Sequence, residues 1–459
     1  MKISLIIPTY NRKDFLYQTL LYISEQKISI EHDFEVIVVD DGSTDSTNQL
    51  VDKFNTIISS LNYIYRPRDE RSCRSLARNL GLKSSSGDVV VFIDCGMVIP
   101  PTFIEKIISK YIISNDPNNL VLTHYLVGKV IDPHKDDTSI LEQLSPDTIT
   151  DICNQLKNIS CWADRRVGLF DFVSDNLNSY PAPWSVGYDT AALSVPRHLS
   201  IKIGGFDENF LGWGGEDHDF AFRLYKEGAS FVSIRDAFAL HLPHPVEMSI
   251  EAKKINNHTN LLKMHRKNYT LETELRLLYS WQYHNQALEK FNKLILEYII
   301  PPYEVEFIND INNNYLSNSQ KSLLLGLDNM VMVSKLKSSH IFVLNKTTLN
   351  KFKEIPGRTV NYLLGCDTPY EDHFFDIVII SDFCRILGPT IFCNLLSEMR
   401  RISKKILIMY SPAFVSEVHL VDGWPWMNES EMLDLIKSIF PYSYKKSSNR
   451  LLEITQIIQ

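Results

Sequence analysis

Short runs of β-branched and apolar residues alternate with amphipathic stretches over residues 1–93. The runs KISLII, FEVIVV, NYIY and DVVVFI have the length and composition of buried strands. The stretches between them have helical periodicity and span residues 14–26, 46–59 and 72–84. Because strands that alternate with helices form parallel sheets through crossover connections, the pattern predicts an α/β fold, a parallel sheet covered by helices.

Polar side chains follow three of these predicted strands. They are Thr9, Tyr10, Asn11 and Arg12 after the first strand, Asp40 and Asp41 after the second, and Asp94 after the fourth. In such sheets ligands bind outside the carboxyl ends of the strands, so these positions predict a binding edge. Any one of the carboxylates could instead be a solvated loop residue.

The regular pattern stops and then resumes. Residues 116–180 are rich in Asp, Asn and Ser, which predicts a substrate-shaping insertion rather than core. From 184 to 240 the runs YDTAALSV and ASFVSI are predicted strands, and 217–227 is a predicted helix. Residues 247–268 are predicted to form a helix with many Lys and Arg residues. Such a face is usually solvated, and contact with a membrane surface or phosphate is the alternative.

After about residue 270 the chain becomes Leu- and Asn-rich and helical in pattern, up to about 336. The runs HIFVLN, TVNYLL, FDIVII and KILIMY then predict a second block of strands and helices. The change predicts three segments: an α/β domain over 1–270, a helical linker over 271–336 and a smaller Rossmann-like α/β domain over 337–459.

Composition excludes several classes of protein. A length of 459 residues favours more than one domain, and a net charge of −8 argues against a nucleic-acid partner, whose binding domains are usually basic. No apolar run reaches the roughly 18 residues of a membrane-spanning helix. The apolar run at the N-terminus ends at Pro8, which does not fit a signal peptide.

Seven cysteines are scattered without CxxC spacing, which predicts neither a disulfide framework nor a zinc site. We therefore expect a cytoplasmic location, with peripheral contact at the inner face of the membrane as the alternative. The number of subunits is not indicated by the sequence.

Four motifs occur in a fixed order in the first block: PTYNR, VVDDGSTD, ARNLGL and GDVVVFID. Together they resemble the family 2 glycosyltransferases, over roughly residues 1–270. The resemblance implies the GT-A fold, a Rossmann-like mixed sheet with helices on both faces. The resemblance implies an inverting enzyme that moves a sugar from a nucleotide sugar, most often a UDP-sugar, to a hydroxyl of a glycan or peptide. Polysaccharide biosynthesis is the setting it implies.

The same resemblance assigns donor-binding residues. Those at the nucleoside would be Pro8, Thr9, Tyr10, Arg12, Asp40 and Asp41. A carboxylate can accept the imide N–H of uracil, and an aromatic ring offers a stacking face. Arg78 would bind the pyrophosphate, because a guanidinium matches phosphate oxygens in two-point contact. An ion pair between Arg78 and a structural carboxylate is the alternative.

A divalent cation, Mn²⁺ or Mg²⁺, is implied with one departure from the family pattern. Family members carry Asp-x-Asp where this chain has Asp94, Cys95 and Gly96, so the second carboxylate is missing. Oxygen ligands suit these ions, so the loss weakens the expected site without removing it. The resemblance offers His241 as a further ligand, with His244 second, although most single histidines are structural.

The segment GWGGEDHD resembles the acceptor and catalytic segment of inverting GT-A enzymes such as β-1,4-galactosyltransferases and chondroitin-type polymerases. It implies that Asp217 is the general base and that Glu216 binds acceptor hydroxyls. Trp213, Gly214 and Gly215 would contact the sugar, because glycines allow close approach and an indole ring lies flat on a sugar face. Capping of a helix start explains one acid but not three.

Two neighbouring features complete the predicted site. Trp184, Tyr188 and Asp189 are candidates for the wall that lines the donor sugar, and a buried aromatic cluster is the alternative. Asp219 and Arg223, four residues apart on one helix face, are predicted to form a supporting ion pair.

The second block is similar to the later half of class I methyltransferases over about 120 residues. The segment HIFVLNKTTLN lacks the glycines that let backbone approach a nucleotide cofactor such as S-adenosylmethionine. We therefore expect a degenerate domain used for binding or assembly, with a bifunctional glycosyltransferase and methyltransferase as one alternative. A catalytically weak sugar-nucleotide-binding module whose tail recruits a partner is the other.

Overall fold

The structure is a computed structural model that describes residues 1–129, 131–244, 248–297, 305–317, 319, 321–327, 329–409, 427–440, 444–448 and 451–455. The chain divides into two compact units, Met1–Leu261 and Leu262–Gln459. Each unit contains one sheet, and each is described by itself.

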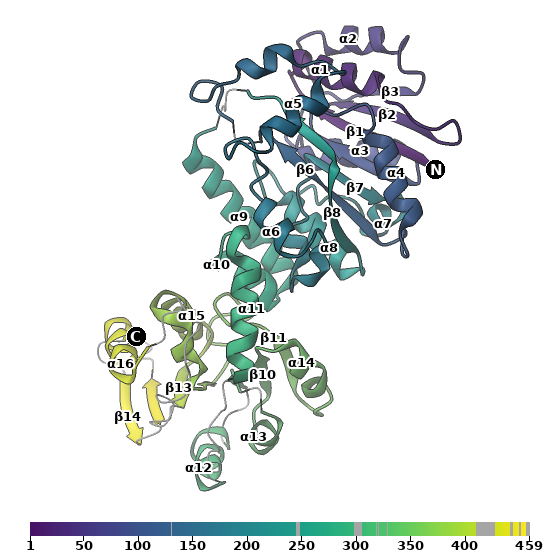
Figure 1. Cartoon of the computed structure of the whole chain (residues 1–459). Coiled ribbons are helices and arrows are strands. Elements are labelled where there is room, and N and C mark those ends of the chain that lie inside the picture. The colour runs from purple at the N-terminus through teal and green to yellow at the C-terminus, as the bar shows by residue number, and fades with distance from the viewer. Residues whose placement is uncertain are drawn as a thin grey trace. The chain divides into compact units, whose positions relative to one another are not determined.

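The first unit is built on a mixed sheet of eight strands in the order β3-β2-β1-β4-β7-β6-β8-β5. Strands β3, β2, β1 and β4 are parallel, β7 runs antiparallel to both of its neighbours, and β6 is parallel to β8. Figure 1 shows β1, β2 and β3 side by side. The strands are β1 (Lys2–Thr9), β2 (Asp33–Asp40), β3 (Leu61–Tyr65), β4 (Val89–Ile93), β5 (Met97–Val98), β6 (Leu120–Val127), β7 (Ala192–Pro196) and β8 (Ser230–His241).

Helices cover both faces of this sheet because side chains alternate along each strand. Ile3, Leu5 and Ile7 of β1 face a core that includes residues of α1, α2 and α4. On the other face α3 packs so closely that a Cβ on Gly81 would overlap Ile6. The helices are α1 (Lys13–Ser24), α2 (Thr47–Phe54), α3 (Arg74–Ser84), α4 (Phe103–Ile113), α5 (Ile149–Leu156), α6 (Val167–Phe172), α7 (Arg197–Lys202), α8 (Glu216–Lys226) and α9 (Ile250–Asn268). This confirms the predicted fold class.

One sequence prediction is corrected in the first unit. Residues 116–180 were expected to form an insertion outside the core, but β6 lies within the sheet and all eight of its residues are buried. The rest of that segment holds short elements: η1 (Ser139–Gln143), α5, α6 and η2 (Leu177–Ser179), with η3 (Pro183–Ser185) following. The polar residues on either side of Leu120–Val127 hid an apolar strand.

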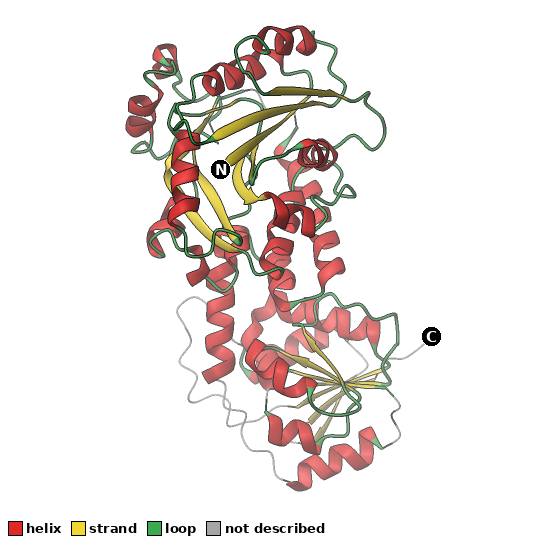
Figure 2. Cartoon of the chain, turned by 90° about the vertical axis from the view of Figure 1, so that its right-hand side faces the viewer, coloured by secondary structure: helices red, strands yellow, loops and turns green. Residues whose placement is uncertain are grey.

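The second unit holds a sheet of seven strands in the order β11-β10-β9-β12-β13-β15-β14, flanked by helices (Figure 2). Strands β11 to β13 are parallel, and β15 is antiparallel to both β13 and β14. The strands are β9 (Ser322–Leu325), β10 (His340–Val343), β11 (Thr359–Tyr362), β12 (Ile377–Ile380), β13 (Lys405–Met409), β14 (Tyr444–Ser448) and β15 (Leu451–Thr455). The predicted second α/β block is therefore present.

Strand β9 lies inside the segment 271–336 that the sequence pattern assigned to a helical linker, so the second sheet begins earlier than expected. The helical elements of this unit are α10 (Leu271–Leu278), α11 (Trp281–Glu297), α12 (Val305–Ile311), the π-helix η4 (Asn312–Leu316), α13 (Met330–Lys335), α14 (Lys346–Lys353), η5 (Asp382–Leu387), α15 (Gly388–Ile402) and α16 (Glu429–Ile439). The parts of the predicted 337–459 domain at 410–426, 441–443, 449–450 and 456–459 lie outside the described residues.

Within the described part of the chain, no helix combines the length and the apolar character needed to cross a bilayer.

Candidate functional site

The carboxyl ends of β1 and β2 meet because Thr9 is paired with Asp40 in the parallel register. Asp40 is buried, and its carboxylate accepts hydrogen bonds from the hydroxyl of Tyr63 at 2.6 Å and the backbone N–H of Ser43 at 2.7 Å. Asp40 therefore shapes the turn after β2 as well as lying at the expected binding edge.

Asp41 is held by basic residues from the segment after β3. Its carboxylate pairs with Arg66 at 2.9 Å and Arg68 at 3.0 Å, and it accepts a hydrogen bond from Ser72 at 3.0 Å. The guanidinium of Arg68 also lies over the ring of Tyr10, 3.9 Å from its centroid. Tyr10 is 41% exposed, so this edge presents an aromatic ring and an arginine together.

The end of β1 packs against the segment that follows β4. The hydroxyl of Thr9 donates to the sulfur of Cys95 at 3.6 Å, and the thiol of Cys95 donates to the carbonyl of Arg12 at 3.6 Å. Pro8 lies one position earlier in the same strand. These contacts bring the predicted nucleoside residues beside Asp94.

Arg78 links two parts of the predicted site. Its buried guanidinium donates to Asp94 at 2.8 Å and to Glu216 at 3.4 Å, joining the end of β4 to the start of α8. Asp94 remains partly exposed, with 38% of its side chain accessible. In this structure Arg78 makes the ion pairs that the sequence left as the alternative to phosphate binding.

Helix α8 presents the two acids predicted for catalysis. It begins at Glu216, after Gly215 at φ +88°, and the carboxylate of Asp217 accepts a hydrogen bond from the backbone N–H of His218 at 2.8 Å. Burial and the charges of Glu216 and Asp189 raise the pKa of Asp217 to about 7, against the opposing effect of Lys129 and Arg78. A carboxyl group with such a pKa can exchange a proton near neutral pH.

Lys129, which the sequence analysis did not single out, forms an ion pair with the buried carboxylate of Asp189. Burial opposes ionisation of Asp189, but the charges of Lys129 and Arg166 outweigh it and lower the pKa of Asp189 to about 2. Asp189 is therefore an anion whose charge acts on Asp217. No signal in the sequence connects residues 129 and 189.

The aromatic residues of the predicted donor wall differ from one another. Trp184 is fully buried, with its ring 5.1 Å from that of Phe222. Trp184 therefore belongs to a buried aromatic cluster, the alternative given in the sequence analysis. Tyr188 is partly exposed and stacks on His218, with ring centroids 3.7 Å apart. Tyr188 thus lies against the residue that follows Asp217, and the buried Trp184 ring meets that same histidine edge-on, with centroids 6.3 Å apart.

The glycines of GWGGED are required by the packing of α9. Gly212, Gly214 and Gly215 all have positive φ, and a Cβ on Gly215 would lie 2.6 Å from Cβ of Asn260. Asn260 donates hydrogen bonds to the carbonyls of Leu211 at 3.1 Å and Gly214 at 2.6 Å. Asparagines of α9 therefore fix the path of this loop.

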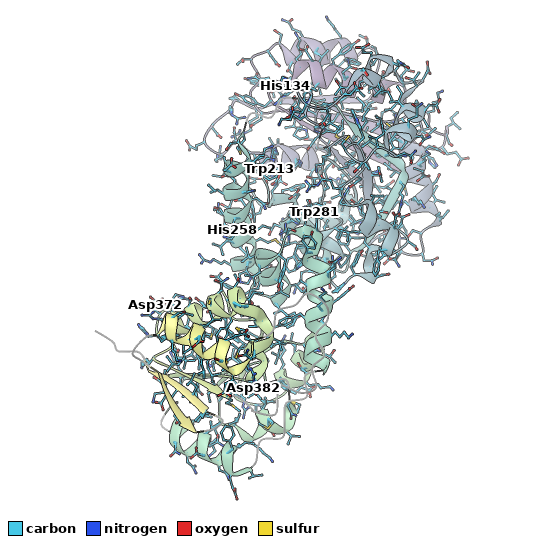
Figure 3. The ribbon with its side chains drawn as sticks, turned by 60° about the vertical axis from the view of Figure 1, so that its left-hand side comes forward. His134, Trp213, His258, Trp281, Asp372 and Asp382 are labelled. Atoms are coloured by element: carbon cyan, nitrogen blue, oxygen red, sulfur yellow. The ribbon has the colours of Figure 1, made fainter. Side chains whose placement is uncertain are left out.

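Trp213, between these glycines, keeps 36% of its surface exposed and lies beside α9 (Figure 3). The ammonium of Lys253 is 5.3 Å from the centroid of the Trp213 ring. The predicted ion pair behind this loop is confirmed: Arg223 pairs with Asp219 at 2.7 Å and donates to the carbonyls of Ile203 and Gly205.

The residues predicted to bind a metal lie close together in the fold. His241 is paired with Met97 across β8 and β5, and the backbone N–H of Leu242 donates to the carbonyl of Gly96. Burial, His244 and Lys129 lower the pKa of His241 to about 4, and among the described residues its buried Nδ1 has no hydrogen-bond partner. A neutral imidazole of this kind suits a metal ligand. Among the described residues, no group of three or more His, Cys, Asp or Glu is arranged to hold an ion.

The missing second carboxylate of the Asp-x-Asp motif has a backbone explanation. Gly96 has φ +95°, a conformation that favours glycine, and a Cβ there would lie 3.2 Å from the ring of Phe15. The backbone N–H of Gly96 donates to the hydroxyl of Thr19 at 3.0 Å. A residue with a carboxylate side chain at position 96 would therefore be strained.

In the second unit, the crevice at the end of β9 is filled by protein. A Cβ on Gly326 would overlap the ring of Phe383, and the hydroxyl of Ser381 donates to the carbonyl of Gly326 at 2.6 Å. After β11, the backbone N–H groups of residues 364–367 all donate to the buried carboxylate of Glu274. Such a cluster of N–H groups is an anion site, and the chain's own glutamate occupies it.

Two family models match the first unit. Residues 4–173 match the model described as glycosyl transferase family 2, and residues 180–245 match one described as the N-terminal domain of galactosyltransferase. Residues 4–173 therefore match a family 2 glycosyltransferase domain, as the four motifs indicated.

Curated relatives cover the same part of the chain. Validoxylamine A glucosyltransferase from Streptomyces hygroscopicus subsp. jinggangensis is 30% identical over 273 residues, which are 60% of this chain and 62% of that protein. Chondroitin synthase from Escherichia coli is 32% identical over 257 residues, 53% of this chain and 35% of that protein. The chain thus spans about three fifths of the validoxylamine A enzyme and a smaller part of the synthase.

Among solved structures, Staphylococcus aureus TarS 1-349 in complex with UDP-GlcNAc aligns with 68% of this chain and 80% of that chain, at 19% identity and a TM-score of 0.41. None of these comparisons supports the expected methyltransferase-like character of the second unit.

Proposed function

We propose that this chain, whose residues 4–173 match a family 2 glycosyltransferase domain, transfers a sugar from a nucleoside diphosphate sugar to an acceptor hydroxyl with inversion at the anomeric carbon. The observation that carries the proposal is the chain of contacts from Asp94 through Arg78 to Glu216 and Asp217. It connects the carboxyl end of β4, where a donor would bind, with a carboxyl group whose pKa suits proton transfer. The relatives named for sugar transfer support the same activity.

The donor would bind along the ends of β1 and β2. Tyr10 and Arg68 offer a stacking surface to the base, and Asp40 and Asp41 supply acceptors for its N–H group. A uracil base fits this set, so a UDP-sugar is the proposed donor. Tyr188 and Asp189 would then face the donor sugar, with Trp184 behind them.

Asp217 would take the proton from the attacking hydroxyl. As the acceptor oxygen bonds to the anomeric carbon, the bond from that carbon to the diphosphate oxygen breaks, and the leaving diphosphate keeps the electron pair. A single in-line displacement of this kind inverts the anomeric centre. Glu216, held by Arg78, would hydrogen-bond the acceptor and keep its hydroxyl aimed at the donor. The acceptor would be a glycan or a peptide.

A divalent cation, Mn²⁺ or Mg²⁺, would be held by Asp94 and His241 together with the donor diphosphate. The partly exposed Asp94 carboxylate fits this role, as does Nδ1 of His241, which has no hydrogen-bond partner within the part of the chain that the structure describes. When bound, such an ion neutralises charge on the leaving diphosphate.

The decisive experiment is Asp217→Asn with a panel of UDP-sugars. We expect transfer, and slow hydrolysis to UDP in the absence of acceptor, to fall by orders of magnitude, while calorimetry shows unchanged affinity for UDP. Near-normal turnover would exclude Asp217 as the base. Failure of the wild-type chain to hydrolyse any UDP-sugar would favour the second candidate function, a catalytically weak sugar-nucleotide-binding module. The missing second carboxylate of the Asp-x-Asp motif is the observation that favours this candidate.

The second unit would serve binding or assembly, as a degenerate relative of methyltransferases. Phe383 over Gly326 and Glu274 in the backbone N–H cluster support this, because both occupy places where a cofactor would approach backbone. Titration with S-adenosylmethionine tests it. Micromolar binding would restore the bifunctional alternative.

A further inference from the structure

Two basic residues contact the segment that carries the proposed base, one at Trp213 and the other at Glu216. Lys253 of α9 lies over the Trp213 ring, and Arg74, the first residue of α3, has Nη1 4.0 Å from Oε1 of Glu216. Arg74 is about half-exposed and Lys253 is partly exposed, so both are open to a ligand. We call Arg74, Lys253 and Trp213 the cationic rim.

The charges of the cationic rim are poorly balanced. Within the described residues, Lys253 has no carboxylate partner, and burial together with the charge of Arg74 lowers the pKa of Lys253. Glu216, whose carboxylate is 4.0 Å from Arg74, lies closer to Arg78, at 3.4 Å. Like charges held near one another repel, so an anion placed between them is favoured. The net charge of the chain is −8. The cationic rim is therefore a local positive patch and does not reflect a surface that is basic throughout.

We propose that the acceptor is an anionic glycan whose carboxylate or phosphate group is bound by Arg74 and Lys253 while its sugar ring packs on Trp213. Charge-assisted hydrogen bonds from Arg and Lys suit these groups, and an indole ring suits the apolar face of a sugar. The inference rests on the proposed function, which places the acceptor hydroxyl at Glu216 and Asp217. The rim then adds the substrate class to that site.

Binding of the full chain to immobilised glycans tests this in the presence of UDP. The set contains uronate-bearing and phosphate-bearing oligosaccharides, the carboxyl-reduced form of each uronate, and neutral chains. We expect retention of the anionic chains and at least about tenfold weaker binding of the reduced forms, as for one lost hydrogen bond to a charged group. The two anionic arms identify which group is bound.

Variants place the effect on the rim. Lys253→Gln and Arg74→Gln should each lose most of the preference for anionic chains, whereas Lys254→Gln, an exposed neighbour on α9, should keep it. The inference is overturned if the wild type retains neutral chains alone or none, or if both rim variants keep the preference.

Calorimetry with UDP separates the donor from the acceptor. Equal loss of UDP affinity in the rim variants would assign these cations to the donor diphosphate and overturn the inference. Wild-type protein that hydrolyses UDP-sugars but ignores anionic glycans refutes the inference alone. Wild-type protein that binds no nucleotide refutes the proposed function itself.

Discussion

Arg78 donates a hydrogen bond to Asp94 across 2.8 Å, from a guanidinium that is only 2% exposed. The same guanidinium reaches Glu216, so a single buried cation holds carboxylates that are far apart in sequence. Removing one member of a buried charge group leaves its partners uncompensated, which is costly.

Arg78→Met should therefore lower the free energy of unfolding by about 3 kcal/mol and also abolish transfer. Urea denaturation measures the first effect. Arg71→Met, at an exposed arginine paired with Asp69, is the matched control and should change stability by less than about 1 kcal/mol. Equal effects of the two substitutions would contradict the structural role of Arg78.

The pH dependence of transfer should follow Asp217. A general base acts in its deprotonated form, so kcat/KM should rise with pH through about 7, the pKa of this carboxyl group. Lys129 acts to lower that pKa, so Lys129→Met should move the rising limb to higher pH. If the rising limb does not move in the Lys129→Met variant, Lys129 does not influence the pKa of Asp217. Lys135→Met, at an exposed lysine paired with Asp132, is the control.

The same group makes a prediction about stability. The pKa of Asp217 is 3.8 in the unfolded chain and about 7 in the folded state. The free energy of unfolding therefore decreases as pH rises from about 3.8 to about 7. Asp217→Asn removes that cost, so the variant should gain stability over the wild type at pH 8 and lose the gain near pH 4. Thermal unfolding at the two pH values checks it, and a variant less stable than wild type at pH 8 would contradict it.

The glycine loop offers a matched pair of substitutions. Gly228 has φ +91° with open space around it, whereas Gly215 has φ +88° and lies against Asn260. Gly228→Ala should cost about 1 kcal/mol from backbone strain alone. Gly215→Ala should cost clearly more, because its new Cβ would meet Cβ of Asn260. Asn260→Gly removes that Cβ, so it should cost less in the Gly215→Ala background than in the wild type. Urea denaturation of the variants measures these costs, and equal costs for the two glycines would show that Asn260 does not press on the loop.

Removal of divalent metal should stop transfer, and Mn²⁺ or Mg²⁺ should restore it. His241→Ala should raise the Mn²⁺ concentration needed for half-maximal activity by at least about tenfold, as loss of a ligand does. His134→Ala, at an exposed histidine, should leave it unchanged. Full turnover in excess EDTA would show that a positive side chain acts in place of the metal.

Much of this fold could be predicted from the sequence, and the reason differs from one element to the next. Strands β1, β2 and β4 are buried on both faces, so their apolar runs and the acids after them predicted a binding edge. Strand β6 was missed because Asp- and Asn-rich segments surround it, and β9 because its run of four residues also fits a helix.

The site was predictable only where motifs mark it. Lys129 meets Asp189 across sixty positions of sequence, and Arg74 meets Glu216 across a longer separation still. Such contacts depend on the sheet order, not on local spacing. Trp184 was a fair candidate by composition, yet its complete burial follows from the packing of Phe222, which the sequence does not show.

The asparagines that border the glycine loop belong to α9, about forty-five residues further along the chain. The glycines of the loop have no side chains where they contact these asparagines. The conformation of the loop is therefore determined by side chains of α9. Engineering of new acceptor scope would therefore begin with substitutions at Asn256, Asn257 and Asn260, leaving the conspicuous glycine motif intact.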